Sequence, residues 1–161
     1  MWKNISKIAV FMLFIALFIS CNKDGGKMVP SKNAEVKKGV KPIPDNEVAV
    51  VEMEEPVYGK FTIELYSNVA PQMVARFKEL AKEGVYNGTY FHRVNTDVVQ
   101  GGDPLTKDND PDNDGTGKSD KPNVPAEFSD IPYDVAIVGA ARSQDVNSQN
   151  SQFFILSLIH I

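Results

Sequence analysis

Two polar side chains, Arg93 and Gln100, interrupt a run that otherwise has the composition of buried β-strands, FHRVNTDVVQGGD from Phe91 to Asp103. They are seven residues apart, and on an unbroken strand an odd separation places side chains on opposite faces. The polar Asn95-Thr96-Asp97 between them predicts a break in the pleat that would let both residues share one site. Taken alone, these residues favour ordinary interpretations, Arg93 as a surface ion-pair partner and His92 as a half-buried histidine whose hydrogen bonds are satisfied.

A second set of candidate site residues lies near the end of the chain. The stretch SQNSQFFI contains Gln152 followed by two adjacent aromatic residues, Phe153 and Phe154. Gly101-Gly102, directly after the first run, permits a bulge or the close approach of another backbone. On the residues alone, Phe154 has an ordinary interpretation as a core side chain.

The elements that would position these residues are strands and one helix. EVAVVEME and KFTIELY, separated by the turn Glu55–Gly59, predict two antiparallel strands, because apolar residues alternate with polar ones in KFTIELY. APQMVARFKELAKEG predicts an amphipathic helix with Pro71 in its first turn and Gly84 at its end. TYFHRV and VVQGGD predict two more strands after the Asn87-Gly88 turn. The chain is then almost wholly polar from Pro104 to Pro125, and AEFSDIPYDVAIVGAAR resumes a strand-like pattern.

Five stretches, in one order between Phe61 and Ile155, together resemble the cyclophilin family of peptidyl-prolyl cis/trans isomerases. They are APQMVARFKELAKEGVYNGTYFHRV, QGGDP, PAEF, AARSQDVNS and SQFFI. The resemblance implies a mainly β fold, a closed eight-stranded antiparallel barrel with two capping helices and a groove on its outer surface for an X-Pro peptide. It implies a peptidyl-prolyl isomerase that acts on proline-containing polypeptides, with no metal and no cofactor. We expect a monomer.

The resemblance also assigns roles to residues. It implies that Arg93 is the catalytic arginine, that Gln100 and Gln152 hold the substrate backbone, and that Phe154 forms the floor of the proline pocket. The residues implied at the catalytic centre are Arg93, Gln100 and Phe154. The residues predicted to contact substrate around them are Gln152, Ala141, Arg142, Val98 and His92.

One departure from the family pattern motivates a second hypothesis. The family usually has an aromatic residue three positions before the glutamine, and the loop leading to it is one residue longer than here. Val98 is the nearest apolar candidate in this chain. A valine offers the proline ring a smaller contact surface than an aromatic side chain does, and so holds the ring less firmly. The alternative prediction is therefore a cyclophilin-like module that binds proline peptides with little catalysis.

The N-terminal region predicts export and attachment to a membrane. Lys3 and Lys7 precede the apolar run IAVFMLFIALFIS, which is too short for a membrane span and predicts a signal peptide over residues 1–20. Phe18-Ile19-Ser20-Cys21 resembles a bacterial lipoprotein box, with Cys21 as the lipidated residue; an ordinary signal peptide is the alternative. Residues 21–46 are rich in Lys, Gly, Pro and Asn and predict a flexible tether. We expect the protein in the bacterial cell envelope, lipid-anchored and facing the periplasm or the cell surface.

Residues 47–155 are predicted to form a partial cyclophilin-like domain. The last six residues, LSLIHI at 156–161, resemble the translation of a sequencing adapter and predict a non-native tail, with a family domain truncated at its C-terminus. The alternative is an apolar strand.

The charge pattern bears on two other classes of function, nucleic-acid binding and calcium binding. A net charge of −4, with no run of Lys or Arg in the body of the chain, argues against nucleic-acid binding. Asp110, Asp112 and Asp114, followed by Gly115, copy the first half of a calcium loop. Lys121 stands where an EF-hand needs a glutamate. We interpret the segment as a solvated acidic loop, with adventitious calcium binding as the alternative.

Overall fold

The structure is a computed structural model and describes residues 35–157. The predicted signal peptide, Cys21, residues 21–34 of the predicted tether and residues 158–161 lie outside the described residues. The helices and strands are, in chain order, β1 (Val48–Glu52), the 3-10 helix η1 (Pro56–Tyr58), β2 (Lys60–Glu64), α1 (Pro71–Lys82), β3 (Arg93–Val94), β4 (Val98–Gly101), the 3-10 helix η2 (Pro104–Lys107), β5 (Val138–Ala140) and β6 (Phe153–Leu156).

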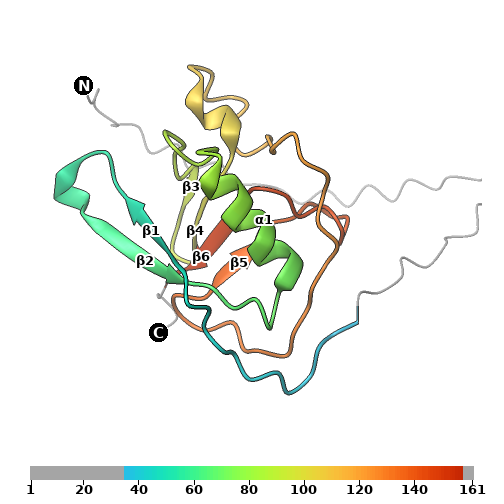
Figure 1. Cartoon of the computed structure of the whole chain (residues 1–161). Helices are drawn as coiled ribbons and strands as arrows, with labels where there is room; N and C mark the ends of the chain where they lie inside the picture. Colours follow the sequence, from blue (N-terminus) through green and yellow to red (C-terminus); the bar gives the residue numbers. More distant parts are fainter. Residues whose placement is uncertain (1–34, 158–161) are drawn as a thin grey trace, which may run out of the picture. The chain divides into compact units, whose positions relative to one another are not determined.

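Strands β1 and β2 form an antiparallel ribbon, as their alternating sequences predict (Figure 1). The turn between them contains η1 and ends at Gly59, whose φ of 66° is in the left-handed region that favours glycine. Phe61 and Ile63 face the core, and their neighbours Lys60, Thr62 and Glu64 are exposed. Period-two alternation therefore gives this ribbon one buried face and one solvated face.

The four remaining strands form a second antiparallel sheet in the order β3-β4-β6-β5. Phe153, Ile155 and Val138 lie on the face that packs into the core. Residues at the alternate positions, Gln100 and Phe154 among them, project from the other face because side chains alternate along a strand. The sheet thus separates an apolar inner face from an outer face that carries the predicted site.

Helix α1 packs its apolar side against the inner face of this sheet (Figure 1). It begins with Pro71 in its first turn and is followed by Gly84 at φ 72°, as predicted. Leu80 is fully buried, and the Phe77 ring meets the Phe153 ring edge to face at 5.6 Å between centroids. Aromatic contacts of this kind fix the distance between helix and sheet, and with it the backbone that carries Gln152 and Phe154.

The described residues do not form the predicted closed barrel with two capping helices. Residues 35–157 contain six strands in two separate sheets and one α-helix, and no strand of the β1–β2 ribbon pairs with the larger sheet. Side chains connect the two sheets instead: the Phe61 ring of β2 lies 6.5 Å from the Phe91 ring, which in turn packs edge to face against Phe153 of β6. The fold is mostly β, as the sequence predicts. Within the same residues, no helix is long and apolar enough to cross a membrane.

Residues 35–46, which the sequence assigns to a flexible tether, are hydrogen-bonded to the domain. The Lys37 amide donates to the Phe128 carbonyl at 2.9 Å, and the Gly39 amide donates to the Asp130 carboxylate. Further along, the Asp45 carboxylate accepts hydrogen bonds from Ser67 and from Lys78 of α1, at 2.7 Å from the lysine. The sequence of residues 35–46 does not predict this packing, because the segment is held by polar contacts and lacks the apolar pattern that indicates a buried element.

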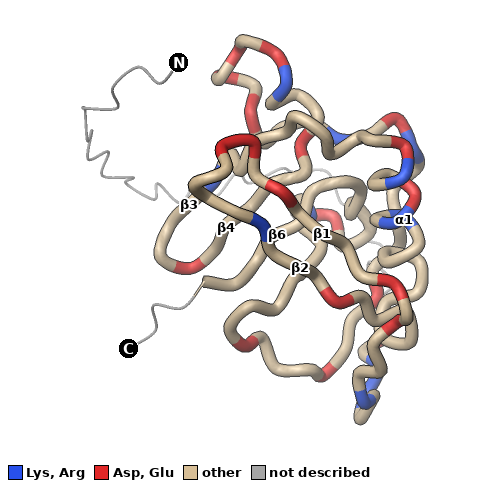
Figure 2. Tube along the Cα trace, turned by 60° about the vertical axis from the view of Figure 1, so that its left-hand side comes forward, with Lys and Arg blue, Asp and Glu red and all other residues tan. Residues whose placement is uncertain are grey.

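Charged residues are spread over the described surface without forming a face of one sign (Figure 2). Acidic residues lie along the ribbon, the loops and α1, and several of the basic ones pair with them, as Lys78 does with Glu47 at 2.9 Å. Lys78 also pairs with Asp45 at 2.7 Å, so it joins two acidic residues near the start of the domain to α1.

Candidate active site

The strand register places three of the predicted site residues in one row across the outer face of the sheet. Arg93 of β3 pairs with Gln100 of β4, and Gln100 pairs with Phe154 of β6. Residues directly opposite each other on antiparallel strands project from the same face. Gly139 of β5 pairs with Phe154 and ends the row. Arg93 is exposed, whereas Gln100 and Phe154 are half-buried.

The turn between β3 and β4 brings Arg93 and Gln100 together despite their odd separation. The Asn95 amide donates to the Val98 carbonyl at 3.0 Å, and the Asn95 side-chain oxygen accepts from the amides of Asp97 and Val98. This asparagine-capped turn reverses the chain, so that the two residues face each other on neighbouring strands. The predicted break in the pleat at residues 95–97 is confirmed.

Gln100 and Gln152 are joined by a hydrogen bond. Gln100 Nε2 donates to Gln152 Oε1 at 2.9 Å, although 52 residues separate them in sequence. Gln152 Nε2 in turn donates to the carbonyl oxygens of Gly115 and Gly117, at 3.0 and 2.7 Å. The Ala141 amide donates to the Gln152 carbonyl at 2.9 Å, which sets Ala141 beside this pair. The two predicted backbone-holding amides thus lie in one place.

Phe154 lies over Gly139, and this contact requires a glycine. A Cβ at position 139 would be 2.4 Å from Phe154 Cζ and 2.9 Å from both of its ring Cε atoms. The Tyr133 ring lies beside the same phenylalanine, with centroids 6.2 Å apart, and is 73% exposed. The site therefore has two neighbouring aromatic rings on its outer face, only one of which the sequence pattern predicted.

A cleft of about 540 Å³ opens next to the glutamine pair. Its lining residues come from β4, from the polar stretch and from the chain between β5 and β6. They are Gln100, residues 115–118, Asn123, residues 141–143, Asp145, Ser148, Asn150 and Gln152. Ala141 and Arg142, which the family resemblance places at the peptide-binding edge, both line this cleft. Arg142 is exposed, and its Nη1 donates to the Ser143 carbonyl at 2.9 Å.

Val98 and His92 have different relations to the row. Val98 pairs with Leu156 and shares the outer face with Gln100, because the two are separated by two residues on β4. His92 immediately precedes Arg93, and a Cβ at Gly115 would lie 3.0 Å from its ring. Both His92 ring nitrogens are buried and have no hydrogen-bond partner. His92 therefore packs beneath the loop at Gly115 rather than in the row.

The Tyr86 hydroxyl supports the backbone just before Gln152. It donates to the Ser151 carbonyl at 3.1 Å, and burial raises the pKa of Tyr86 above its ordinary value. A neutral phenol remains a hydrogen-bond donor at all physiological pH values. In residues 35–157, no cluster of three or more His, Cys, Asp or Glu side chains is placed to hold a metal ion, the acidic loop at 108–114 included.

Comparison with known proteins assigns the family. The family model described as cyclophilin type peptidyl-prolyl cis-trans isomerase/CLD matches residues 49–158. This chain is a member of the cyclophilin family. Its row of Arg93, Gln100 and Phe154 therefore lies on a cyclophilin fold. The family resemblance of the five sequence stretches is confirmed.

Individual relatives support the assignment. A probable peptidyl-prolyl cis-trans isomerase of Brucella suis is 47% identical over 103 residues, which are 61% of this chain and 53% of the relative. A peptidyl-prolyl cis-trans isomerase of Dictyostelium discoideum is 39% identical over 103 residues, 60% of each chain. The crystal structure of a cyclophilin-type isomerase of Cryptosporidium parvum, determined with the dipeptide Ala-Pro, aligns with a TM-score of 0.54 at 29% identity, over 62% of this chain and 63% of that one. This cyclophilin chain therefore spans about half the length of the Brucella relative.

Sequence reasoning missed three residues of this cyclophilin site. Tyr133 comes from a loop whose path no local pattern predicts. Gly139 carried a signal, since a glycine inside a strand pattern often marks the close approach of another group. Asn150 lies within SQNSQFFI, and only its burial at 3% exposure distinguishes it from an ordinary polar loop residue.

Proposed function

We propose that this cyclophilin domain catalyses cis–trans isomerisation of X-Pro peptide bonds in polypeptides, and so assists their folding. One observation carries the proposal: the register that sets the Arg93 guanidinium, the Gln100 amide and the Phe154 ring in one row on the outer face. We also propose that the complete domain closes into the barrel expected for the family.

The chemistry of the reaction suits these residue types. Rotation about the peptide C–N bond has a barrier of about 18–20 kcal/mol, because the nitrogen lone pair is delocalised into the carbonyl. In the twisted transition state that lone pair is localised on nitrogen and can accept a hydrogen bond from Arg93. The planar ground state does not offer this acceptor fully, so the bond stabilises the transition state selectively.

The arginine alone does not supply the whole rate enhancement. A hydrogen bond to a charged group contributes roughly 1.5–3 kcal/mol, which corresponds to about one to two powers of ten in rate. The remainder must come from holding the peptide in place. Phe154 gives the proline ring an apolar surface, while Gln100 and Gln152 offer amide groups to the peptide backbone.

The test is the isomerisation rate of an X-Pro peptide, measured by exchange NMR on the full-length protein. Arg93→Ala should lower the rate by at least tenfold, and Arg93→Lys should not restore it fully because an ammonium lacks the planar guanidinium fork. Lys60→Ala, which removes an exposed cation from β2, is the matched control and should have no effect. An unchanged rate in Arg93→Ala would reject the assignment.

The second candidate function is a proline-peptide binding module with little catalysis. Val98 and the short turn at residues 95–97 favour it, because a small side chain on the outer face leaves the proline ring less constrained. The same NMR experiment distinguishes the two functions. Peptide binding with no cis–trans exchange above the spontaneous rate would support the binding module.

We also propose that the protein acts in the bacterial cell envelope, anchored by a lipid on Cys21 after removal of residues 1–20. The apolar run followed by Phe18-Ile19-Ser20-Cys21 supports this proposal. Mass spectrometry of the protein purified from its own membranes should show a diacylglyceryl-modified N-terminal cysteine. A Cys21→Ser variant that still fractionates with membranes would contradict the anchor.

A further inference from the structure

The carbonyl groups that hold Gln152 belong to a loop, residues 115–124, which we call the cleft loop. It runs beside residues 149–152 and is bonded to them along its length. The Val124 amide donates to the Gln149 carbonyl at 2.8 Å at one end, and Gln152 reaches Gly115 and Gly117 at the other. Between these two contacts lies Asn150.

Asn150 uses its full hydrogen-bonding capacity on the cleft loop. Its Oδ1 accepts from the Ser119 amide at 3.0 Å and from the Ser119 hydroxyl at 2.6 Å. Its Nδ2 donates to the Lys121 carbonyl at 2.9 Å and to Asn123 Oδ1 at 3.2 Å. An asparagine side chain offers two donors and two acceptor sites, so none is left over. Asn150 is only 3% exposed, so the loss of any of these bonds would leave a buried polar group unpaired.

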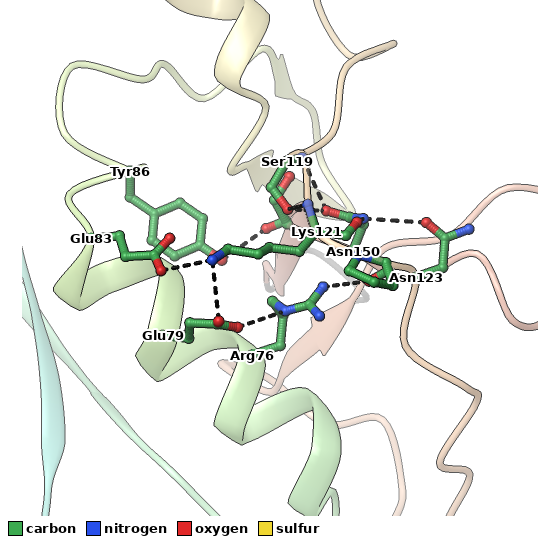
Figure 3. Close-up of polar contacts among 10 residues, drawn as sticks. Arg76, Glu79, Glu83, Tyr86, Ser119, Lys121, Asn123 and Asn150 are labelled. Atoms are coloured by element: carbon green, nitrogen blue, oxygen red, sulfur yellow. Dashed lines mark hydrogen bonds and ion pairs between the residues drawn. The ribbon is translucent and has the colours of Figure 1, made fainter.

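The opposite side of the cleft loop is bonded to helix α1 (Figure 3). Lys121 Nζ lies 2.7 Å from Glu83 and 3.3 Å from Glu79, and Arg76 donates to the Pro122 carbonyl at 2.6 Å. The Glu79 and Glu83 side chains are exposed, at 43% and 44%, so solvent weakens the ion pairs that Lys121 makes with them, whereas Asn150 makes four bonds to the loop at 3% exposure. Asn150 is therefore the main internal support of the loop.

The loop carbonyls determine the orientation of the Gln152 side-chain amide, and through it that of the Gln100 amide. Both N–H groups of Gln152 Nε2 are used by Gly115 and Gly117, so only Oε1 remains to face Gln100. The reversed amide would place Oε1 against two carbonyl oxygens. Gln100 must then present Nε2 to Gln152. Its own Oε1, which accepts no hydrogen bond from another residue of 35–157, remains as an acceptor in the row that contains Arg93.

We propose that Asn150 is a positioning residue for the isomerase site, a role that rests on the proposed function for its effect on rate. By holding the cleft loop, Asn150 fixes the two carbonyl oxygens that orient Gln152, and through Gln152 it determines which end of the Gln100 amide meets the substrate. Asn150 does not itself belong to the row. Its removal should disorient the glutamines without removing them.

The decisive variant is Asn150→Asp, which keeps the shape of the side chain but replaces both N–H donors by a carboxylate oxygen. That oxygen would face the Lys121 carbonyl and Asn123 Oδ1, so the loop must move away. Asn147→Ala is the matched control, because Asn147 also ties two segments together, through the Ala126 amide at 3.0 Å, but it is exposed and does not line the cleft.

Two readouts on the full-length protein separate positioning from mere stability. The first is the side-chain NH₂ resonances of Gln100 and Gln152 in ¹⁵N NMR spectra, with their hydrogen-exchange rates. The second is the isomerisation rate of an X-Pro peptide, separated into kcat and KM. In Asn150→Asp we expect faster exchange of the Gln152 NH₂ and a fall in kcat of about tenfold, since small misplacements cost large factors in rate. KM should change less than threefold, and Asn147→Ala should resemble the wild type in both readouts.

Each outcome decides the question. If folded Asn150→Asp keeps the wild-type Gln152 resonances and kcat, the proposal is wrong. If Asn150→Asp does not fold, Ser119→Ala replaces it. This variant removes the 2.6 Å hydroxyl bond to Asn150 and a longer bond, 3.4 Å, that the hydroxyl accepts from the Lys121 amide within the loop. It should still speed Gln152 NH₂ exchange, and unchanged exchange would overturn the proposal. If the wild-type protein shows no isomerisation, the proposed function fails on its own, while the NMR readout still tests whether Asn150 positions the glutamines.

Discussion

Substituting Gly139 by alanine should damage the site while costing little stability. The new Cβ would start 2.4 Å from Phe154 Cζ, whereas carbon atoms in contact prefer about 3.5 Å or more. The ring tip must therefore move by about 1 Å. Phe154 is half-buried on the outer face, so its ring can tilt outward. We expect a loss of about 1 kcal/mol in the free energy of unfolding, at the lower end for overpacking.

The effect on function should be larger, because a displacement of about 1 Å at a reacting site can cost up to about a hundredfold in rate. We expect kcat/KM for an X-Pro peptide to fall by ten- to a hundredfold in Gly139→Ala. Chemical denaturation measures the stability, and exchange NMR measures the rate. The double variant Gly139→Ala/Phe154→Leu should lose little more than Phe154→Leu alone, since both changes act on one ring. Wild-type kcat/KM in a folded Gly139→Ala protein would refute the argument.

Two further predictions concern residues at the edges of the site and of the domain. Tyr133→Ala should weaken the binding of a proline peptide by about two- to tenfold, the amount expected for one aromatic contact, as measured by NMR titration; unchanged affinity would show that Tyr133 does not reach the substrate. Hydrogen bonding to Lys78, and then to Ser67, lowers the pKa of Asp45 from 3.8 to about 2. Because the folded pKa is depressed, its stabilisation is present above about pH 4 and is lost as the pH falls through 2. The difference in urea midpoint between wild type and Asp45→Asn should therefore shrink between pH 5 and pH 2, and a constant difference would contradict the assignment.

The sequence predicts those elements of the domain whose structure is set by the pattern of nearby residues. Alternation predicts β1 and β2, and the proline and glycine at its ends predict α1. The polar break at residues 95–97 predicts that Arg93 and Gln100 meet, because a turn between two strands allows residues at an odd separation to project from the same face of the sheet. These features depend on neighbours within about ten residues.

Features that depend on distant partners are not predictable in this way. The contact of Gly139 with Phe154 and the bonds of Asn150 to the cleft loop join segments far apart in the chain, and nothing in the polar stretch itself indicates where it is held. Residues 35–46 also lack apolar periodicity, yet Lys37 and Asp45 attach them to the domain. The closed barrel was expected from the family resemblance rather than from local pattern, and the strands of residues 35–157 form two sheets.

The attachment of residues 35–46 limits how far the domain can lie from the proposed lipid anchor. A fully extended tether from Cys21 to residue 46 would span at most about 90 Å, whereas one that ends at residue 35 would span at most about 50 Å. For a protein anchored at Cys21 as proposed, the shorter tether would keep the row of Arg93, Gln100 and Phe154 closer to the lipid headgroups. Its clients would then be polypeptides that emerge at, or dwell near, that surface.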